Sequence, residues 1–216
     1  STQIKYYASG GSVAFSKEEC IKDLSKALDN NFDGFKMRCG FQSFEDDFER
    51  VKAVDEFIKK QKNSYRKFSL MIDFIQGTLK PKFSVNKLEE YVQYYKIYDI
   101  LWFEEPLNPD AINLYKKLSK NTLDKSCLGE SFTSINEYIA FESLLSRFQL
   151  DVTHIGGFQE AIKVLNYFSD YHENTKFTSH IWGSKLSMLL NFALCKATSS
   201  IEWFEIPLLD FDINKH

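Results

Sequence analysis

The sequence lacks an excess of basic residues and lacks any long hydrophobic run, and each absence excludes a class of function. Lys and Arg number 27 against 30 Asp and Glu, which gives a net charge of −3. No basic surplus is present to neutralise a phosphate backbone, so we expect no nucleic-acid partner. The longest apolar run, residues 186–195, is interrupted by Ser187 and Asn191. Because a bilayer crossing takes ~20 apolar residues, we expect no membrane partner.

Cysteine and proline are also scarce, with four of each, and no signal-like segment is present. The four cysteines form no CxxC pair, and their wide spacing suits neither a zinc site nor a compact disulfide framework. Scattered thiols are typical of a reducing compartment, so we predict a cytoplasmic protein. The first five residues form no signal peptide. No Gly/Ser-rich or Pro-rich linker divides the chain, so residues 1–216 are predicted to form one domain.

Short apolar runs alternate regularly with amphipathic stretches along the chain. The runs that predict strands are residues 5–8, 35–39, 68–72, 100–103, 126–128, 148–150, 176–178 and 201–204. Helix-start signals lie between them, such as the capping box formed by Ser16 and Glu19, and a capping Ser43. After the fourth run, Asn108–Pro109 predicts an N-cap followed by proline at the first helical position.

This alternation predicts an α/β fold. Repeated strand–helix units indicate a parallel sheet with both faces covered. Eight strands and seven intervening helices favour a closed TIM-type (β/α)7β barrel, and an open doubly wound sheet is the alternative.

Acidic residues end three consecutive predicted strands: Asp73, Glu104 and Glu130. In a barrel the chemistry sits at the carboxyl ends of the strands, so these carboxylates are expected to converge. Three like charges repel unless a cation neutralises them, and Mg²⁺ prefers carboxylate oxygens. The pattern therefore predicts a Mg²⁺ site. For any single one of them, the alternative is a helix cap or a solvated loop acid.

Further polar residues end the neighbouring strands. Lys36 and Arg38 point the same way because side chains alternate along a strand. Asp151 and His180 end adjacent strands, and a carboxylate on Nδ1 would make His180 a general base or acid. A capping role for His180 near Ser184 is the alternative.

Aromatic and other histidine residues carry weaker signals. Trp102 and Trp203 are predicted core residues, whereas Trp182, two residues past His180, could wall the site. His154 could face the mouth or solvent. Two histidines are expected to be uninvolved: His172 in a polar surface turn and the terminal His216.

Seven of these stretches, in this order, resemble the enolase superfamily and more closely its mandelate-racemase-like branch. The similarity runs from about Tyr7 to Glu205, and each stretch falls at a predicted strand end. The stretches are Gly34-Phe35-Lys36-Met37-Arg38-Cys39-Gly40, Leu70-Met71-Ile72-Asp73, Trp102-Phe103-Glu104-Glu105-Pro106, Leu128-Gly129-Glu130, Asp151-Val152-Thr153-His154-Ile155-Gly156-Gly157, Thr178-Ser179-His180 and Trp203-Phe204-Glu205.

The resemblance implies a role for each position. Asp73, Glu104 and Glu130 would bind Mg²⁺, with Glu105 supporting Glu104. Asp151 and His180 would form the His–Asp dyad of the branch. Glu205 would hydrogen-bond an oxygen of the substrate carboxylate or enolate, with Asp210 as the fallback for that role.

The implied chemistry is Mg²⁺-dependent removal of the proton alpha to a carboxylate, through an enediolate. The branch usually carries a basic Lys where this chain has Arg38, and an Arg keeps its proton. One competent base, His180, suits dehydration of a sugar acid to a 2-keto-3-deoxy acid, catalysed by a lyase. Ile75 stands where the branch commonly has Asn, so the exact substrate cannot be taken over from a relative.

Other functions stay open. A racemase, epimerase or cycloisomerase on a related carboxylate shares every step up to the enediolate. A non-catalytic barrel fragment is a second alternative, motivated by Arg38 and the short length. A phospho-accepting receiver domain using Asp73 is disfavoured, because such a domain would leave about 100 residues unexplained.

The resemblance also makes the length look short. A barrel of this type typically takes ~250 residues, and family members carry an additional N-terminal α+β capping domain. The chain begins with Ser1 at the first barrel strand. We therefore expect an excised barrel whose capping domain lies in a missing N-terminal part. Homo-oligomers occur in the family, so a homo-oligomer is possible.

Overall fold

The computed structural model describes residues 4–61, 67–75 and 84–208. Asp210 and His216 lie outside the described residues. The strands are β1 (Lys5–Gly10), β2 (Gly34–Arg38), β3 (Ser69–Asp73), β4 (Ile100–Glu104), β5 (Ser126–Cys127), β6 (Arg147–Leu150), β7 (Lys176–Ser179) and β8 (Ile201–Pro207). The helices are α1 (Lys17–Asp29), α2 (Phe44–Lys60), α3 (Val85–Tyr95), α4 (Ile112–Tyr115), α5 (Lys120–Asp124), α6 (Ile135–Ala140), α7 (Phe158–Tyr171) and α8 (Lys185–Ala197).

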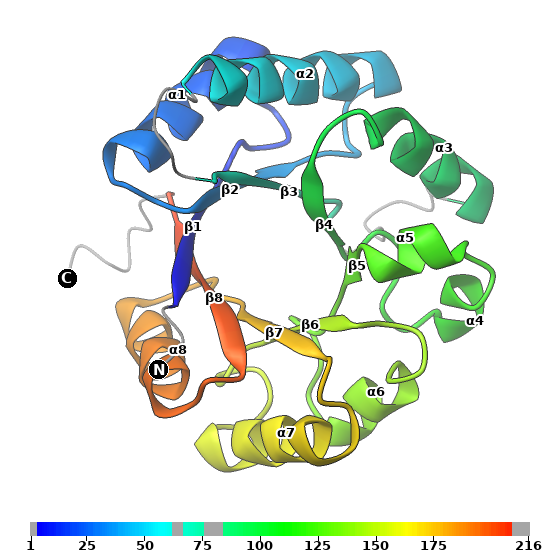
Figure 1. Ribbon diagram of the computed structural model, residues 1–216, viewed down its shortest axis with the longest axis vertical. Coiled ribbons are helices and arrows are strands. Elements are labelled where there is room, and N and C mark those ends of the chain that lie inside the picture. Colours follow the sequence, from blue (N-terminus) through cyan, green and yellow to red (C-terminus); the bar gives the residue numbers. More distant parts are fainter. Residues whose placement is uncertain (1–3, 62–66, 76–83, 209–216) are drawn as a thin grey trace.

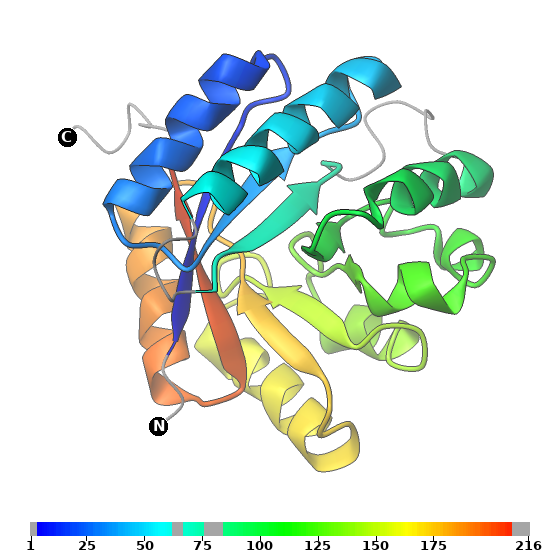
Figure 2. The same ribbon diagram turned by 45° about the horizontal axis from the view of Figure 1, so that its top comes forward.

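All eight strands are parallel neighbours in one sheet, in the order β5-β4-β3-β2-β1-β8-β7-β6. Figure 1 is a view along the axis of the ring into which this sheet curls, with the helices outside it. The tilted view in Figure 2 shows α1 and α2 side by side on the outer surface. This arrangement confirms the predicted TIM-type barrel and excludes the open doubly wound sheet.

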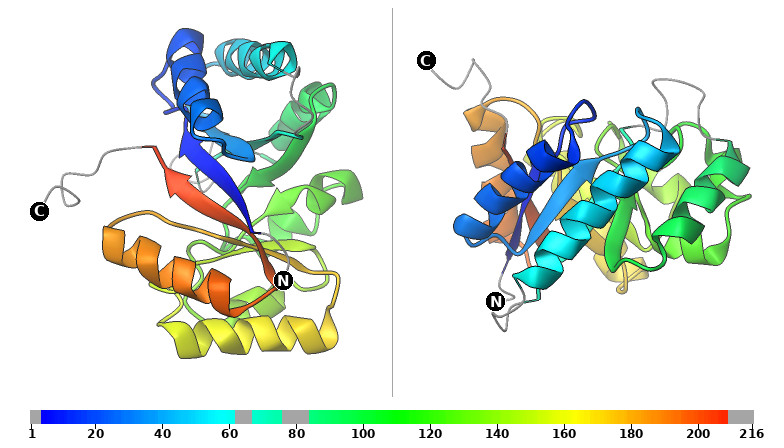
Figure 3. Two further views of the ribbon diagram at one scale, coloured as in Figure 1. Left: turned by 60° about the vertical axis from the view of Figure 1, so that its left-hand side comes forward. Right: turned by 90° about the horizontal axis from the view of Figure 1, so that it is seen from above.

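The number of backbone residue pairs between neighbouring strands differs around the ring. The first and last strands, β1 and β8, lie side by side and pair over five residue pairs, from Lys5–Trp203 to Ser9–Pro207 (Figure 3). On the opposite side, β5 and β6 meet through one isolated bridge between Leu128 and Phe148. We call this β5–β6 junction the seam. It makes the barrel nearly, rather than fully, closed.

The helix-start signals position most helices where they are expected. Ser16 accepts from the backbone N–H of Glu19 in a complete capping box, and Ser43 caps α2 through the backbone N–H of Asp46. The prediction for Asn108–Pro109 is wrong. Asn108 instead accepts a hydrogen bond from the N–H of Asp110 in a local turn, and α4 begins only at Ile112. A second short helix, α5, follows it, so the described residues contain eight helices and not seven.

The barrel interior is filled by its own cluster of side chains, separate from the core between strands and helices. That cluster consists of Tyr7, Met71, Trp102, Cys127 and Trp203, all buried. Since strand side chains alternate in direction, the residue two positions further along each strand points into the same interior, nearer the carboxyl end. The interior therefore changes from apolar to polar toward the carboxyl ends of the strands. Among the described residues, no helix is long and apolar enough to cross a bilayer.

Candidate active site

A pocket with a volume of about 330 Å³ opens at the carboxyl ends of the strands. It is lined by Lys36, Arg38, Asp73, Ile75, Glu104, Glu130, His154, His180, Trp182 and Glu205. Seven of these ten residues are among the eight site residues predicted from the sequence. The remaining predicted residue, Asp151, does not line the pocket but contacts His180 directly.

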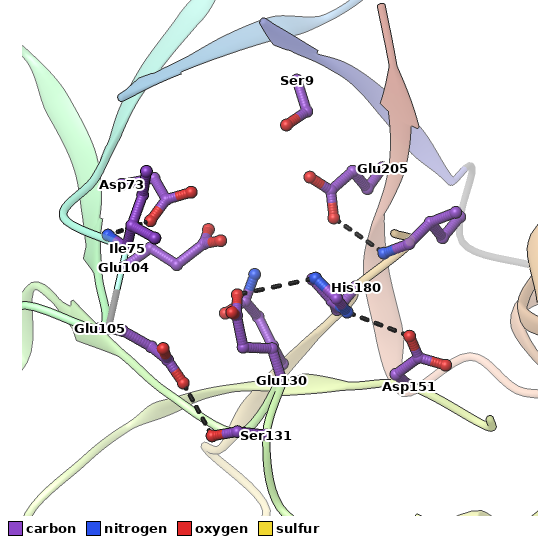
Figure 4. A network of polar contacts seen from close by, with 12 residues as sticks. Ser9, Asp73, Ile75, Glu104, Glu105, Glu130, Ser131, Asp151, His180 and Glu205 are labelled. Atoms are coloured by element: carbon purple, nitrogen blue, oxygen red, sulfur yellow. Dashed lines mark hydrogen bonds and ion pairs between the residues drawn. The ribbon is translucent and has the colours of Figure 1, made fainter. Parts of the chain in front are cut away.

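The three carboxylates expected to bind metal reach the pocket from neighbouring strands (Figure 4). Asp73 and Glu104 are register partners at the ends of β3 and β4. Glu130 follows Gly129, whose φ of +124° would strain any other residue. A Cβ at Gly129 would also come within 2.3 Å of the Gln149 carbonyl oxygen. Glycine is therefore needed for the chain to turn Glu130 into the mouth.

Lys36 supplies a buried positive charge beneath these carboxylates. Its Nζ forms ion pairs with Glu104, with Glu205 Oε1 at 2.8 Å, and with Asp73 Oδ2 at 3.9 Å. Burial alone would lower the pKa of Lys36, but Glu104 and Glu205 raise it well above its ordinary value. Lys36 therefore remains an ammonium and binds anionic groups.

One ammonium does not balance the negative charge of the mouth. Burial raises the pKa of Glu104 well above its ordinary value, and Asp73 and Glu130 raise it further, against the lowering effect of Lys36. Burial likewise raises the pKa of Glu130 to about 7, with Glu105 and Asp73 adding to the increase. A cluster of carboxylates that resists ionisation is one that a hard dication stabilises, and oxygen donors suit Mg²⁺. The donor set fits the expected Mg²⁺.

A different group of residues has its potential ligand atoms closest together. Within the described residues, Asp151, His154 and His180 form a set of three whose donor atoms all lie within 4.8 Å of one another, and the three predicted carboxylates do not. Lys36 lies between the oxygens of Glu104 and Asp73, which explains that spacing. Two imidazoles favour softer metals than Mg²⁺.

Asp151 and His180 form a buried hydrogen-bonded pair. His180 Nδ1 lies 3.0 Å from Asp151 Oδ2. The other oxygen, Oδ1, accepts from Thr153 and from Asn191 Nδ2. Although burial would raise the pKa of Asp151, these hydrogen bonds, with His180 first, lower it. An ionised carboxylate only accepts, so Nδ1 carries the hydrogen.

The second nitrogen of His180 faces the carboxylates of the mouth. Its Nε2 lies 3.7 Å from Glu130 Oε2, and Figure 4 shows the ring between Glu130 and Asp151. Burial would lower the pKa of His180, but Glu130, Asp151 and Glu205 together raise it to about 10. The protonation of His180 is thus set chiefly by the charge of Glu130.

Glu205 is held in the mouth by both backbone and side-chain partners. Its Oε2 accepts from the N–H of Ile181 at 2.8 Å. Burial raises its pKa, but Lys36 and His180 outweigh burial and leave the pKa below its ordinary value. Glu205 is therefore an ionised acceptor held in place at the end of β8.

Arg38 and Trp182 together form one wall of the pocket. The Arg38 guanidinium lies 4.7 Å from the centre of the Trp182 ring and donates to Gly10 O at 3.1 Å and Ser9 Oγ at 3.3 Å. Its Nε is 3.7 Å from Asp73 Oδ2. These contacts hold Arg38 as a fixed cation, in keeping with its inability to act as a base.

Two further residues lie in or beside the site: His154, whose direction the sequence left open, and Glu105, which the resemblance implied as a support for Glu104. His154 lines the pocket rather than facing only solvent. Glu105 is fully buried beside it, with a φ of +36° that is unusual for a residue other than glycine. Ser131 donates to its Oε1 at 3.0 Å, and burial raises its pKa to about 8. Neither geometry follows from spacing, because both depend on loops that cross between strands.

A (β/α) barrel with buried carboxylates, a lysine and a His–Asp pair at its carboxyl end is a scaffold suited to metal-assisted chemistry on an anionic substrate. The chain belongs to the family described as enolase C-terminal domain-like, whose model matches residues 19–215. Its structural neighbours are mandelate-racemase-like proteins and acid-sugar dehydratases, as the resemblance implied.

Three relatives illustrate the similarity. The L-talarate/galactarate dehydratase of Salmonella typhimurium is 23% identical over 165 residues, covering 74% of this chain and 38% of that protein. The 3,6-anhydro-D-galactonate cycloisomerase of Zobellia galactanivorans has a TM-score of 0.82 at 22% identity, covering 99% of this chain and 56% of that one. L-Talarate dehydratase from Polaromonas sp. JS666, solved with Mg and L-glucarate, has a TM-score of 0.74 at 18% identity, covering 94% and 52%. This chain thus spans about half the length of the structures it matches, and less of the curated relative.

Proposed function

We propose that the protein containing this chain is a Mg²⁺-dependent lyase that dehydrates a sugar acid to a 2-keto-3-deoxy acid. The observation that carries the proposal is that the two imidazoles of the mouth, the Asp151-paired His180 and its neighbour His154, lie together, while Arg38, which keeps its proton, is held against Trp182. Racemisation requires proton transfer on both faces of the carbon, whereas elimination requires one base.

Each residue has a distinct task in this proposal. Asp73, Glu104 and Glu130 hold Mg²⁺, which would supply charge stabilisation for the substrate carboxylate as its alpha carbon loses a proton. Lys36 orients the same carboxylate by its positive charge, and Glu205 holds the Lys36 ammonium in place through their 2.8 Å ion pair. Glu205 itself, as an ionised acceptor, can accept a hydrogen bond from a hydroxyl group of the substrate.

His180 takes the alpha proton on Nε2, while Asp151 holds Nδ1 and stabilises the imidazolium that results. When Glu130 is a ligand, its charge is compensated and no longer raises the pKa of His180. His180 then becomes neutral at a lower pH and can accept a proton. Metal binding and the availability of the base are linked through Glu130.

A racemase, epimerase or cycloisomerase is the second candidate, because one of the most similar folds belongs to a protein described as a cycloisomerase. The two candidates differ after the enediolate, since only dehydration expels a hydroxyl group. A barrel without catalysis is the third candidate.

The test is a screen of the Mg²⁺-loaded protein containing this chain against sugar acids that include galactarate, L-talarate and L-glucarate. We expect a 2-keto-3-deoxy product, scored by its semicarbazone, and its loss in Glu130→Gln and His180→Asn. His172→Asn is the matched control, because His172 contacts Glu142 away from the pocket. Deuterium uptake at the alpha carbon without dehydration would favour the second candidate, and neither reaction would favour the third.

A further inference from the structure

His154 presents one ring nitrogen, Nε2, to the active-site pocket. It lies in the loop after β6, is solvent-exposed, and lines the pocket. Its Nδ1 is 2.7 Å from the backbone carbonyl oxygen of Glu130. A carbonyl oxygen can only accept, so Nδ1 carries a hydrogen and donates it. Nε2 is therefore the nitrogen left for solvent or a bound substrate.

His154 also stands beside His180. The two ring centroids are 5.7 Å apart with the planes inclined at 50°. A ring nitrogen of each lies in the group whose donor atoms fall within 4.8 Å of one another. Two acid–base groups at this separation can each reach, through its own hydrogen bond, groups on adjacent carbons of one substrate.

We propose that His154 is a second catalytic residue, which in its imidazolium form donates the Nε2 proton to the leaving beta hydroxyl after His180 has removed the alpha proton. This inference rests on the proposed dehydration. The alpha C–H bond breaks, its proton goes to Nε2 of His180, and its electron pair is held in the enediolate until it forms the carbon–carbon double bond of an enol. The beta C–O bond breaks, and its pair stays on the oxygen, which takes the proton of His154 and leaves as water.

The remaining steps need no further reactant. The enol loses its hydroxyl proton and gains a proton at the beta carbon, which gives the 2-keto-3-deoxy acid. His180 then releases its proton to solvent, and His154, which is exposed, takes a proton from solvent, so both residues return to their starting states. Because the two imidazoles are neighbours, both groups depart from the same face of the substrate.

With His154 beside it, His180 does not have to carry out both proton transfers. A single histidine would have to remove the alpha proton and then turn the same nitrogen to the hydroxyl. Arg38 cannot take over as the acid, because an Arg keeps its proton and its guanidinium is held by Trp182, Gly10 and Ser9.

The deciding variant is His154→Asn. An Asn side-chain amide can take the place of Nδ1 and donate to the Glu130 carbonyl, but it has nothing equivalent to Nε2. With any sugar acid that the parent dehydrates, we expect dehydration to fall by at least about 100-fold. Deuterium uptake at the alpha carbon in D₂O should stay within about threefold of the parent, since His180 is untouched.

A substrate analogue with fluorine at the beta carbon separates proton donation from other effects. Fluoride leaves with much less help from an acid, so His154→Asn should eliminate it at a rate within about tenfold of the parent. His154→Gln, which cannot protonate a leaving group, should behave as His154→Asn does toward the natural substrate. Thermal unfolding of both variants checks the fold, and His172→Asn is the control that should change neither rate.

Three outcomes overturn the inference. Dehydration by His154→Asn within about threefold of the parent means that no proton comes from this residue. Loss of alpha exchange together with dehydration in a folded variant means that His154 acts earlier than leaving-group departure. Failure of the variant to eliminate fluoride means that its defect is not acid catalysis. A parent protein that neither exchanges nor dehydrates any sugar acid instead sinks the proposed function.

Discussion

Replacing Glu130 by Gln should make the metal-free protein more stable, although it removes a proposed metal ligand. Burial, with smaller increases from Glu105 and Asp73, raises the pKa of Glu130 from 4.5 to about 7. Between these pH values, the folded protein binds a proton that the unfolded chain has released. Stability therefore falls as the pH rises through this window, and stays lower above it.

The size of the effect follows from the same values. The gap between 4.5 and about 7 corresponds to about 3 kcal/mol of unfolding free energy at pH 8. Gln removes this cost because it carries no charge to bury. We expect Glu130→Gln to raise the midpoint of thermal unfolding at pH 8 in a chelator by about 6–12 °C. At pH 5, where the folded parent already holds the proton, the gain should be below about 1 kcal/mol.

Adding Mg²⁺ should reverse the ranking. At a hundredfold excess over its Kd, Mg²⁺ stabilises a protein by about 3 kcal/mol. The parent should gain this at pH 8 and Glu130→Gln should not. Glu56→Gln, on an exposed position of α2, is the control that should stay within about 0.5 kcal/mol at both pH values. A Glu130→Gln protein that is less stable than the parent at pH 8, or equally stabilised at pH 5, would refute this reasoning.

Three further changes test the site and its support. Asp151→Asn should lower the pKa of His180, measured by NMR titration, because the 3.0 Å carboxylate contact is lost, and should cut turnover at least about 100-fold. Gly129→Ala should cost about 2 kcal/mol or more in urea unfolding, since its φ is +124° and the new Cβ meets the Gln149 carbonyl; a neutral result would contradict the need for glycine at this turn. Phe148→Ala should cost about 3–5 kcal/mol, because the ring is fully buried, and a cost under 1 kcal/mol would mean that the site collapses around the gap.

The strands and most helix starts could be predicted because their signals are local. Runs such as residues 100–103 are apolar and short, and a serine such as Ser16 caps its helix through the next three residues. The convergence of Asp73, Glu104 and Glu130 on one pocket then follows from parallel strands ending at one edge.

The remaining features depend on contacts between distant segments. Asn108–Pro109 carries a genuine helix-start pattern, but Asn108 bonds within its own turn instead. His154 is directed by the Glu130 carbonyl, 24 positions away in sequence. The position of Lys36 between the carboxylates requires three strands to be in register. Local pattern contains no information on such pairings.

The seam is held mainly by side chains, and this divides the proposed chemistry mechanically. Tyr138 Oη lies 3.0 Å from the Gly129 carbonyl and 2.9 Å from the Gln149 carbonyl, one on each side. His154 ties the β6 side to Glu130 on the β5 side. The proposed metal ligands thus lie on the β5 side of the seam and the acid–base residues on the β6 side. A change in the width of this junction changes the distance between the two sets of residues. The hydrogen bonds of the Tyr138 hydroxyl group and of the His154 ring therefore fix the distance between the proposed metal ligands and the acid–base residues.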